Sequence, residues 1–349
     1  MKLKKIVVLF CLVLLLSGCQ GVGFEPAYEL LRPPKPSGEK AEIQKTLEQY
    51  AGTDIVLKYP QSGEYRSAFV TTQLTEGESN EAFVFYRPKA DTAGIHCVFM
   101  EKSGGKWVVR KDIAKAEASA VSQIVFSDLN GDGRKEVLIG WGTYSKDNLG
   151  EVYQWDQGDP QILMSNYLYT SSYIADFDGD SLDEIAAIVL DATNQTSEMS
   201  LLKLRDGRLQ TIGKTQLDGK VSGYSLMTFG EIDEDGTKGL FLDGAKGNNS
   251  LITEIVYWND QLSRLENPLY DEETGETSAT LRNIATSCKD INDDGIVEVP
   301  FVLQPNEELM DGENMISAQG DYYTIWGRYE LTGRKFVSVL DVYKRQISR

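Results

Sequence analysis

Acidic loops of one pattern recur along this 349-residue chain. The complete copies are Asp-Leu-Asn-Gly-Asp-Gly-Arg-Lys-Glu at 128–136, Asp-Phe-Asp-Gly-Asp-Ser-Leu-Asp-Glu at 176–184 and Asp-Ile-Asn-Asp-Asp-Gly-Ile-Val-Glu at 290–298. Oxygen-bearing side chains stand at loop positions 1, 3, 5 and 9, and the carbonyl at position 7 can join them around the turn. Hard oxygen donors in this number suit Ca²⁺ rather than zinc or copper. The pattern therefore predicts calcium loops, built like an EF-hand loop without its helices.

Two weaker copies stand in phase with these three. The loop at 231–239 keeps Asp233 and Asp235 but ends in Gly239, and so lacks the last carboxylate. The copy at 73–81 keeps only the frame and is expected to bind nothing. The five loops start at 73, 128, 176, 231 and 290, in steps of 55, 48, 55 and 59 residues. Internal periods of this size are typical of propellers and solenoids.

Short apolar strands separated by Gly, Asn and Asp turns must position these loops. From Asp54 onward the chain repeats such segments, among them Glu136–Trp141, Glu151–Trp155, Gln161–Met164 and Tyr173–Ala175. Each period has room for about four strands of the usual length, and one four-stranded sheet per period is a propeller blade. We therefore expect an all-β protein, a β-propeller of about five four-stranded blades over residues 41–349.

Closure of such a ring admits two alternatives. Five blades close if the strand Ser67–Thr72 completes a last sheet that also contains Val299–Val302, Tyr322–Glu330 and Lys335–Leu340, since closure removes exposed sheet edges. The second alternative is an incomplete six- or seven-bladed ring, because the end of the chain, Tyr343–Arg349, does not read as a strand or a cap.

In these repeats the chain resembles the FG-GAP/VCBS class found in integrin α-chain propellers and in many bacterial surface proteins. In detail it is similar to uncharacterised clostridial lipoproteins with VCBS repeats, over residues 1 to about 340. The resemblance implies an architecture, not an activity. Integrin propeller loops bind calcium, which implies as ligands Asp128, Asn130, Asp132, the Arg134 carbonyl and Glu136; Asp176, Asp178, Asp180, the Leu182 carbonyl and Glu184; and Asp290, Asn292, Asp294, the Ile296 carbonyl and Glu298.

The same loops have a second interpretation as Asx-turns. Asp and Asn side chains there would accept hydrogen bonds from their own backbone, and the acids would serve turn formation and solubility without a metal. In both interpretations the loop has a structural role, because its side chains are committed to holding the turn.

The N-terminus predicts export. Lys2, Lys4 and Lys5 precede the apolar run Ile6–Leu16, which is too short to span a bilayer but has the length of a secretory signal. Leu16-Ser17-Gly18-Cys19 resembles the bacterial lipobox, which implies cleavage after residue 18 and lipidation of Cys19. We expect a signal peptide at 1–18, a Pro-rich tether at 19–40, and an extracytoplasmic protein anchored by its lipid at the cell surface.

The tether is expected to lead into one short helix. Ser37 can cap it, Glu39 and Glu42 suit its first turn, and Gly52 suits its end. Its apolar stripe would be Ile43, Leu47 and Tyr50.

Charge and cysteine content narrow the partners. The net charge is −18, and removal of 1–18 with its three lysines would take it to −21, which repels phosphate backbones and argues against nucleic acid.

Beyond the lipobox only Cys97 and Cys288 remain, both in apolar strand-like contexts. Two buried thiols are expected rather than a disulfide.

No catalytic constellation is evident. The single histidine, His96, stands in an apolar strand, where a packed side chain is more typical than a base. We expect no enzyme and no catalytic residue, but a binding or adhesion module for a glycan or peptide, or a scaffold for envelope proteins. A polysaccharide-acting enzyme is the alternative, because carboxylate pairs can hydrolyse glycosides. Aromatic residues that could bind a ligand, or form core between blades, are Tyr167, Tyr169, Tyr173, Tyr257, Trp258, Tyr322, Tyr323 and Trp326.

Overall fold

The computed structural model describes residues 37–74, 80–90, 94–145, 147–156, 159–303, 308–311, 314–317 and 323–339. The predicted signal peptide, Cys19, the tether up to residue 36 and the segment 340–349 lie outside these ranges, as do residues 75–79 of the weakest loop. The chain forms two compact units, Met1–Lys45 and Thr46–Arg349, and the sheets belong to the second.

The predicted helix is present as α3 (Glu39–Ala51), with Glu39 and Glu42 in its first turn. Ile43 and Leu47 are fully buried, whereas Tyr50 is 52% exposed and is not part of the apolar stripe. Gly52 ends the helix with φ +80°, a left-handed conformation that glycine adopts without strain.

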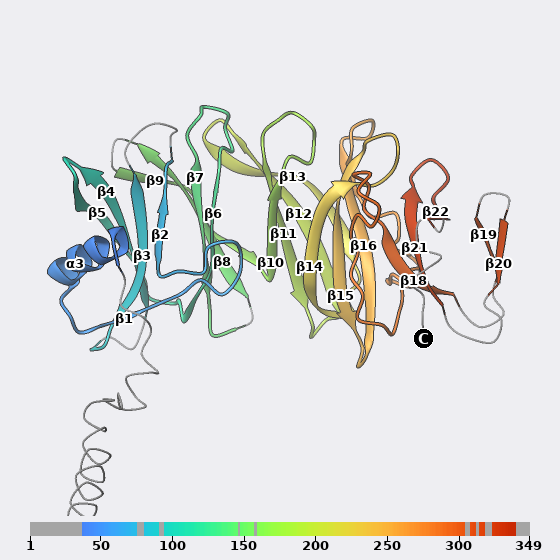
Figure 1. Ribbon diagram of the computed structural model, residues 1–349, viewed down its shortest axis with the longest axis horizontal. Helices are drawn as coiled ribbons and strands as arrows, with labels where there is room; N and C mark the ends of the chain where they lie inside the picture. Colours follow the sequence, from blue (N-terminus) through green and yellow to red (C-terminus); the bar gives the residue numbers. More distant parts are fainter. Residues whose placement is uncertain are drawn as a thin grey trace, which may run out of the picture. The chain divides into compact units, whose positions relative to one another are not determined.

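In the described residues, five antiparallel sheets of three to five strands follow one another in chain order, and a separate two-stranded sheet lies within the sequence of the last (Figure 1). The first contains β1 (Ile55–Leu57), β2 (Phe69–Thr72), β3 (Glu81–Pro88), β4 (Ile95–Ser103) and β5 (Lys106–Lys115). The second contains β6 (Ala120–Ser127), β7 (Glu136–Gly142), β8 (Asn148–Asp156) and β9 (Asp159–Tyr169). The third contains β10 (Ser171–Ala175), β11 (Glu184–Asp191), β12 (Thr196–Arg205) and β13 (Arg208–Leu217).

The last two sheets complete the series. The fourth contains β14 (Val221–Glu231), β15 (Lys238–Lys246), β16 (Ser250–Asn259) and β17 (Arg264–Glu266). The fifth contains β18 (Val299–Leu303), β21 (Tyr323–Glu330) and β22 (Lys335–Ser338), and β19 (Glu308–Asp311) pairs with β20 (Asn314–Ser317) as a hairpin. The expected all-β protein of mostly four-stranded antiparallel sheets is confirmed in these ranges, with five strands in the first sheet and three in the fifth.

Four hydrophobic cores of the described residues each lie between two consecutive sheets. Along β11, Ile185 and Ala187 belong to a core shared with the second sheet, while Ala186 and Ile188 belong to a core shared with the fourth. Successive side chains of a strand point to opposite faces, and here both faces are buried. This double burial explains why the second strands of the sheets read as unbroken apolar runs.

The predicted shared strand is wrong. Ser67–Thr72 contains β2, but β2 pairs with β3 in the first sheet, with Phe69 opposite Val84, and does not complete the last sheet. The physical reason is proximity along the chain, because closing a short hairpin loses far less chain entropy than closing a loop of the whole domain. The other predicted strands of the last sheet correspond to β18, β21 and β22.

A long segment without strands joins β17 to β18 and is fixed by buried charges. The Arg282 guanidinium lies 2.7 Å from Asp243, and both side chains are fully buried. Glu276, nearer the start of the segment, pairs with Lys220 and, at 2.7 Å, with Lys246. The predicted free thiols are also confirmed, since Cys97 and Cys288 are buried and unpaired, and burial raises the pKa of each.

Candidate metal-binding loops

The acidic loops occupy one equivalent place in the sheets. Loop 128–136 joins β6 to β7, loop 176–184 joins β10 to β11, and loop 231–239 joins β14 to β15. Loop 290–298 leads into β18, with an isolated bridge between Lys289 and Glu298 at its base. In three sheets the loop therefore joins the first strand to the second, and in the fifth sheet it leads into β18 after a single bridge.

The first acid of each complete loop binds backbone amides across the turn. Asp128 accepts hydrogen bonds from the amides of Gly131 and Gly133 at 2.7 and 2.9 Å. Asp176 and Asp290 accept the equivalent bonds at distances between 2.7 and 3.0 Å, from Gly179, Ser181, Asp293 and Gly295. All of these donors have positive φ, so the loop wraps its amides around the first carboxylate.

The acid at position 5 makes an Asx-turn in each copy. Asp132, Asp180 and Asp294 accept hydrogen bonds from the amides two residues on, at 2.8, 3.0 and 2.9 Å. The Asx-turn interpretation is thus geometrically correct for these bonds. It leaves the second oxygen of each position-5 carboxylate for another partner.

The glutamate at position 9 closes the loop by a hydrogen bond to its start. One oxygen of Glu136, Glu184 and Glu298 accepts the amide of loop position 2 at 2.8, 2.9 and 2.9 Å. Glu81 does the same with Leu74 at 3.1 Å in the weakest copy. These glutamates are buried in every copy, so their second oxygen needs a partner inside the protein.

That second oxygen has a different partner in each complete loop. In the first loop the Asn130 amide donates to Glu136 Oε1 at 2.9 Å. In the second loop the Lys203 ammonium lies 2.5 Å from Glu184 Oε1. In the last loop Glu298 Oε1 is buried and has no hydrogen-bond partner in the described part of the chain.

Burial and neighbouring acids disfavour charge on two of these glutamates. Burial, followed by the charges of Asp132 and Asp128, raises the pKa of Glu136 to about 7, although the Leu129 amide acts in the opposite direction. Burial, followed by Asp294 and Asp290, likewise raises the pKa of Glu298 to about 7, against the Ile291 amide. A cation in the loop would relieve both effects.

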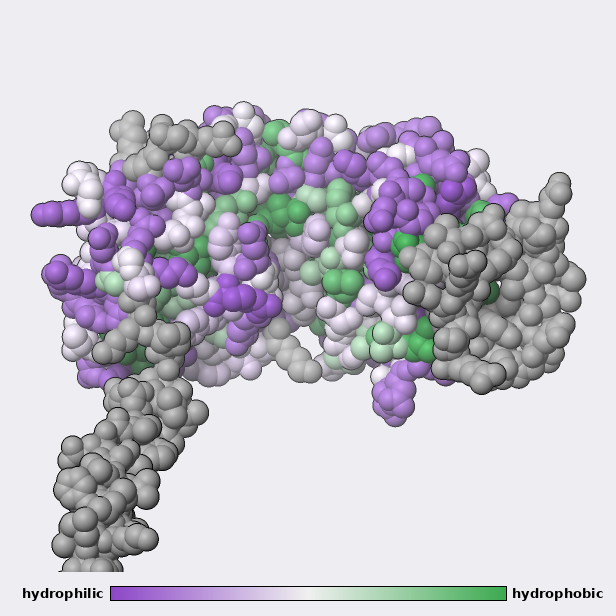
Figure 2. Space-filling view, in the orientation of Figure 1, coloured by the Kyte–Doolittle hydropathy of each residue, from purple (hydrophilic) through white to green (hydrophobic). Residues whose placement is uncertain are grey.

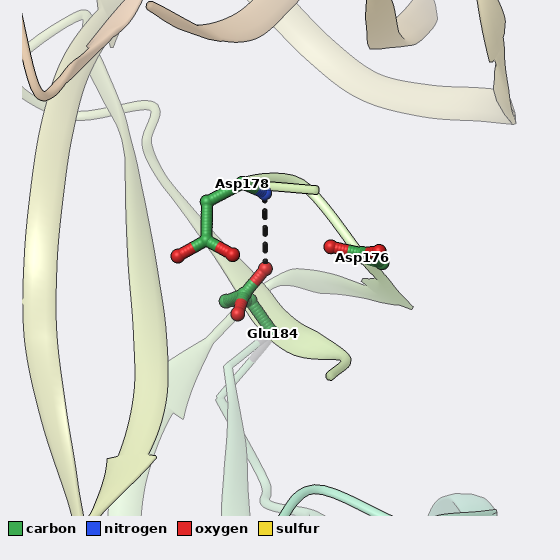
Figure 3. Close-up of side chains that lie close together, drawn as sticks. All are labelled: Asp176, Asp178 and Glu184. Atoms are coloured by element: carbon green, nitrogen blue, oxygen red, sulfur yellow. Dashed lines mark hydrogen bonds between the residues drawn. The ribbon is translucent and has the colours of Figure 1, made fainter. Parts of the chain in front are cut away.

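The second loop holds a compact acidic cluster. Carboxylate oxygens of Asp176, Asp178 and Glu184 lie within 4.8 Å of one another, a spacing that could hold a metal ion. Figure 3 shows these side chains around the turn, with the Asp178 amide donating to Glu184 at 3.4 Å. Lys203 from β12 already lies 2.7 Å from Asp178 and 2.8 Å from Asp180. A metal ion in this loop would have to displace that ammonium.

The residue across from position 9 explains the difference between loops. Because Ile185 pairs with Leu202, the next residue of β12, Lys203, lies opposite the position-9 glutamate. Gln154 occupies the same position in the second sheet, and its side-chain amide donates to Asp132 at 3.3 Å. Arg328 holds it in the fifth sheet but pairs with Glu234 and Glu330 at 2.6 and 2.7 Å. In the second loop the residue opposite position 9 is therefore a cation that contacts three of the loop's acids.

The loop at 231–239 is closed by other contacts. Asp233 is buried and accepts hydrogen bonds from the amides of Asp235 at 3.2 Å and Leu331 at 3.3 Å. Burial raises the pKa of Asp233. Gly239 leaves no carboxylate at position 9, and Ile232 fills the space beside it.

Two contacts outside the loops were not predicted from the sequence. His96 is not simply packed, because its Nδ1 lies 3.0 Å from Asp112, which also accepts a hydrogen bond from the Tyr86 hydroxyl at 2.9 Å.

Among the proposed ligand-binding aromatic residues, Tyr167, Tyr169 and Tyr257 are buried, whereas Tyr173, Trp258 and Trp326 are partly exposed. Tyr322 and the Tyr323 side chain lie outside the description.

Comparisons with known proteins give limited information. No family model and no curated protein matches the chain. Solved structures that resemble it are the exotype rhamnogalacturonan lyase YesX (TM-score 0.39, 13% identity, 69% of this chain and 57% of that chain), the rhamnogalacturonan lyase YesW (0.36, 12%, 76% and 61%) and a Bacillus licheniformis rhamnogalacturonan lyase (0.37, 11%, 76% and 61%). The matched region covers less than two thirds of each of those lyases. Within the described residues, no helix is both long and apolar enough to cross a membrane.

Proposed function

We propose that this chain is an extracytoplasmic binding or scaffold protein, anchored to the membrane by a lipid on Cys19, with calcium in loops 128–136 and 290–298. The consecutive sheets would be the blades of a β-propeller, and calcium would fix the turns that lead into β7 and β18. Shared cores between neighbouring sheets and the equivalent loop positions support the propeller. The lipobox-like residues 16–19 support the anchor.

The observation that carries the calcium proposal is the free oxygen of Glu298. A buried carboxylate oxygen without a partner is costly, and the neighbouring acids Asp290 and Asp294 make the charge harder to hold. A divalent cation compensates all three carboxylates at once. The residues that would hold it are Asp290, Asn292, Asp294, the Ile296 carbonyl and Glu298, all hard oxygen donors.

In both loops the position-3 asparagine has to rotate to admit the ion, since Asn292 now donates to Asp294 Oδ2 at 2.9 Å. Asn130 now donates its amide nitrogen to Glu136 and presents its oxygen to the Asp132 amide. Rotation of the Asn130 side chain would turn an oxygen toward the loop interior, because an amide carries one donor and one acceptor end. With Asp128, Asp132 and Glu136 this completes an oxygen set of the same kind.

In this proposal calcium supplies stability rather than catalysis. The acids at positions 1 and 5 of each loop already accept hydrogen bonds from backbone amides, so their carboxylates stabilise the turn. A rigid turn at the same place in each sheet would hold the adjoining strands and leave the remaining surface for a partner.

Titration calorimetry of the full chain in detergent, stripped with a chelator, tests the calcium sites. We expect binding of two Ca²⁺ ions and no comparable heat with Mg²⁺ at the same concentration. Extracellular calcium modules bind with dissociation constants of about 10⁻⁴–10⁻³ M. Heat and melting temperature that both stay unchanged at about 1 mM Ca²⁺ would leave the Asx-turns as the whole explanation of the loops.

A further inference from the structure

A cavity of about 690 Å³ opens where the first strands of three sheets meet. Its walls come from β6, from the turn and strand at 169–174, from β14 and from the segment 62–64. This segment lies along β6, since the Ser62 amide and hydroxyl both donate to the Ser122 carbonyl, at 2.8 and 2.9 Å. In Figure 2 pale and apolar side chains occupy the middle of the face shown, between more hydrophilic flanks.

The lining of this cavity mixes apolar side chains with many neutral polar groups and carries almost no charge. Its polar groups are mainly hydroxyls and one carboxamide, Gln123, and its single ionisable acid is Glu64 at an exposed position. The chain as a whole carries 53 acidic residues and a net charge of −18. A cavity nearly free of charge in such a protein is suited to a neutral ligand.

Two buried hydroxyls in the lining lack partners. Neither the Tyr169 hydroxyl nor the Ser172 hydroxyl makes a well-aligned hydrogen bond with the described residues, although Ser122 and Gln123 lie beside the first and the Tyr167 hydroxyl lies beside the second. Tyr169 is 1% and Ser172 is 8% exposed. Buried polar groups in native proteins are normally satisfied, so these hydroxyls retain hydrogen-bonding capacity at the edge of the cavity.

Apolar and aromatic surface lies beside these hydroxyls. Tyr173 and Tyr224 line the cavity together with Leu226, which is 42% exposed. The Tyr224 hydroxyl is held by Glu254 at 2.6 Å, so this ring is fixed in place. Rigid tyrosine rings provide apolar contact area at a small cost in conformational entropy.

We propose that this cavity binds an uncharged carbohydrate chain, an inference that rests on the proposed function as a binding protein. A neutral sugar presents hydroxyls that both donate and accept, together with C–H faces that pack on aromatic rings, and the lining offers the complement of both. A peptide would use main-chain hydrogen bonds along a strand edge and would not need the two buried hydroxyls.

Binding to defined oligosaccharides tests the proposal on the full chain in detergent. The probes are cellohexaose, mannohexaose and chitohexaose as neutral chains, hexagalacturonate as a charged chain, and a displayed library of random short peptides. We expect at least one neutral chain to bind, by saturation-transfer NMR and calorimetry, and the charged chain and peptides not to bind.

Variants locate the site. Y169F and S172A each remove one hydroxyl and should weaken binding about three- to ten-fold, the loss of one hydrogen bond. Y173A removes a ring and should weaken it at least as much. Y144A removes a tyrosine that is 81% exposed and does not line the cavity, so its affinity should be unchanged. Y169F keeps the ring and its melting temperature should stay near that of the parent, which separates loss of binding from misfolding.

Several outcomes would overturn the proposal. These are absence of saccharide binding up to about 10 mM, preference for hexagalacturonate or peptide, or equal affinity in all variants. A chain that binds calcium and sediments with membranes but binds none of the neutral chains would overturn this inference alone. A chain that binds cellohexaose through Tyr169 but takes up no calcium would overturn only the proposal on the loops.

Discussion

Lys203 on β12 and Glu184 on β11 face each other at the base of the second acidic loop, with Nζ 2.5 Å from Oε1. The ammonium also contacts Asp178 and Asp180, so one side chain neutralises the centre of a loop that the sequence pattern assigns to calcium. Burial lowers the pKa of Lys203, but hydrogen bonds to the three acids outweigh it and hold the pKa above its usual value. The lysine therefore remains charged and competes with any metal ion.

The variant K203Q should create a third calcium site. Glutamine removes the ammonium and leaves the acids Asp176, Asp178 and Glu184 close together. We expect the calorimetric stoichiometry to rise from two to three. In chelator the variant should lose about 3 kcal/mol of stability, because the buried carboxylates lose their counter-ion. An unchanged stoichiometry would show that the loop geometry itself, not Lys203, excludes the metal.

E298Q should have opposite effects with and without calcium. In chelator the neutral amide relieves a buried, unpartnered carboxylate, so the melting temperature should rise relative to the parent. With about 1 mM Ca²⁺ the variant should lack one calcium increment and gain less stability than the parent. Thermal denaturation under both conditions measures the crossover. A variant less stable than the parent in chelator would contradict the conclusion that Glu298 Oε1 lacks a hydrogen-bond partner when no metal is bound.

D132A and D294A should each remove one calcium increment. Each deletes a position-5 carboxylate, and one site with a dissociation constant of about 10⁻⁴–10⁻³ M contributes roughly 0.4–1.4 kcal/mol at 1 mM Ca²⁺. D235A is the matched control, because its loop lacks the carboxylate at position 9. The calcium-dependent shift in melting temperature should fall in the first two variants and stay at the parental value in the control. Equal losses in all three would indicate a general charge effect.

The contacts of Glu276 predict a loss of stability in acid. Hydrogen bonds from Lys220 and Lys246 lower its pKa from 4.5 to about 2. For an acid with a depressed folded-state pKa, the stabilisation is present above pH 4.5 and is lost as the pH falls from there toward 2. Between these pH values the free energy of unfolding of the parent should fall by an amount that is absent in E276Q. The prediction fails if parent and variant have the same pH dependence over this interval.

C19A tests the anchor. The change removes the thiol that would carry the lipid, so incorporation of labelled fatty acid should stop, and the precursor should either remain uncut or release the protein from membranes. Labelling and membrane fractionation measure both effects, with S17A as a control that keeps the cysteine. Continued lipid labelling of C19A would refute the lipobox interpretation.

The sequence predicted the repeating elements because their signals are local. Apolar runs after each acidic loop correspond to β3, β7, β11, β15 and β18, and each loop leads directly into one of these strands. The runs are unbroken because each strand is buried on both faces, as the division of Ile185 and Ala186 between two cores shows. Local propensity and tertiary environment agree at these positions.

Contacts that depend on strand register could not be predicted in the same way. Lys203 lies 19 residues after Glu184 and meets it only through the pairing of β11 with β12. His96 meets Asp112 only through the pairing of β4 with β5, which contains an irregularity at Phe99. For β2, an apolar strand of four residues fits the first or the last sheet equally well by pattern, and chain connectivity decides between them.

The division of each strand between two cores affects how this chain can change in length. Insertion of one residue into β11 would exchange the side chains that face the second and fourth sheets, and so would disturb both neighbours. Insertion of a whole sheet with its loop adds one interface of the kind already present and disturbs no existing register. Duplication or loss of entire repeats, about 50 residues at a time, is therefore the length change that this architecture tolerates best.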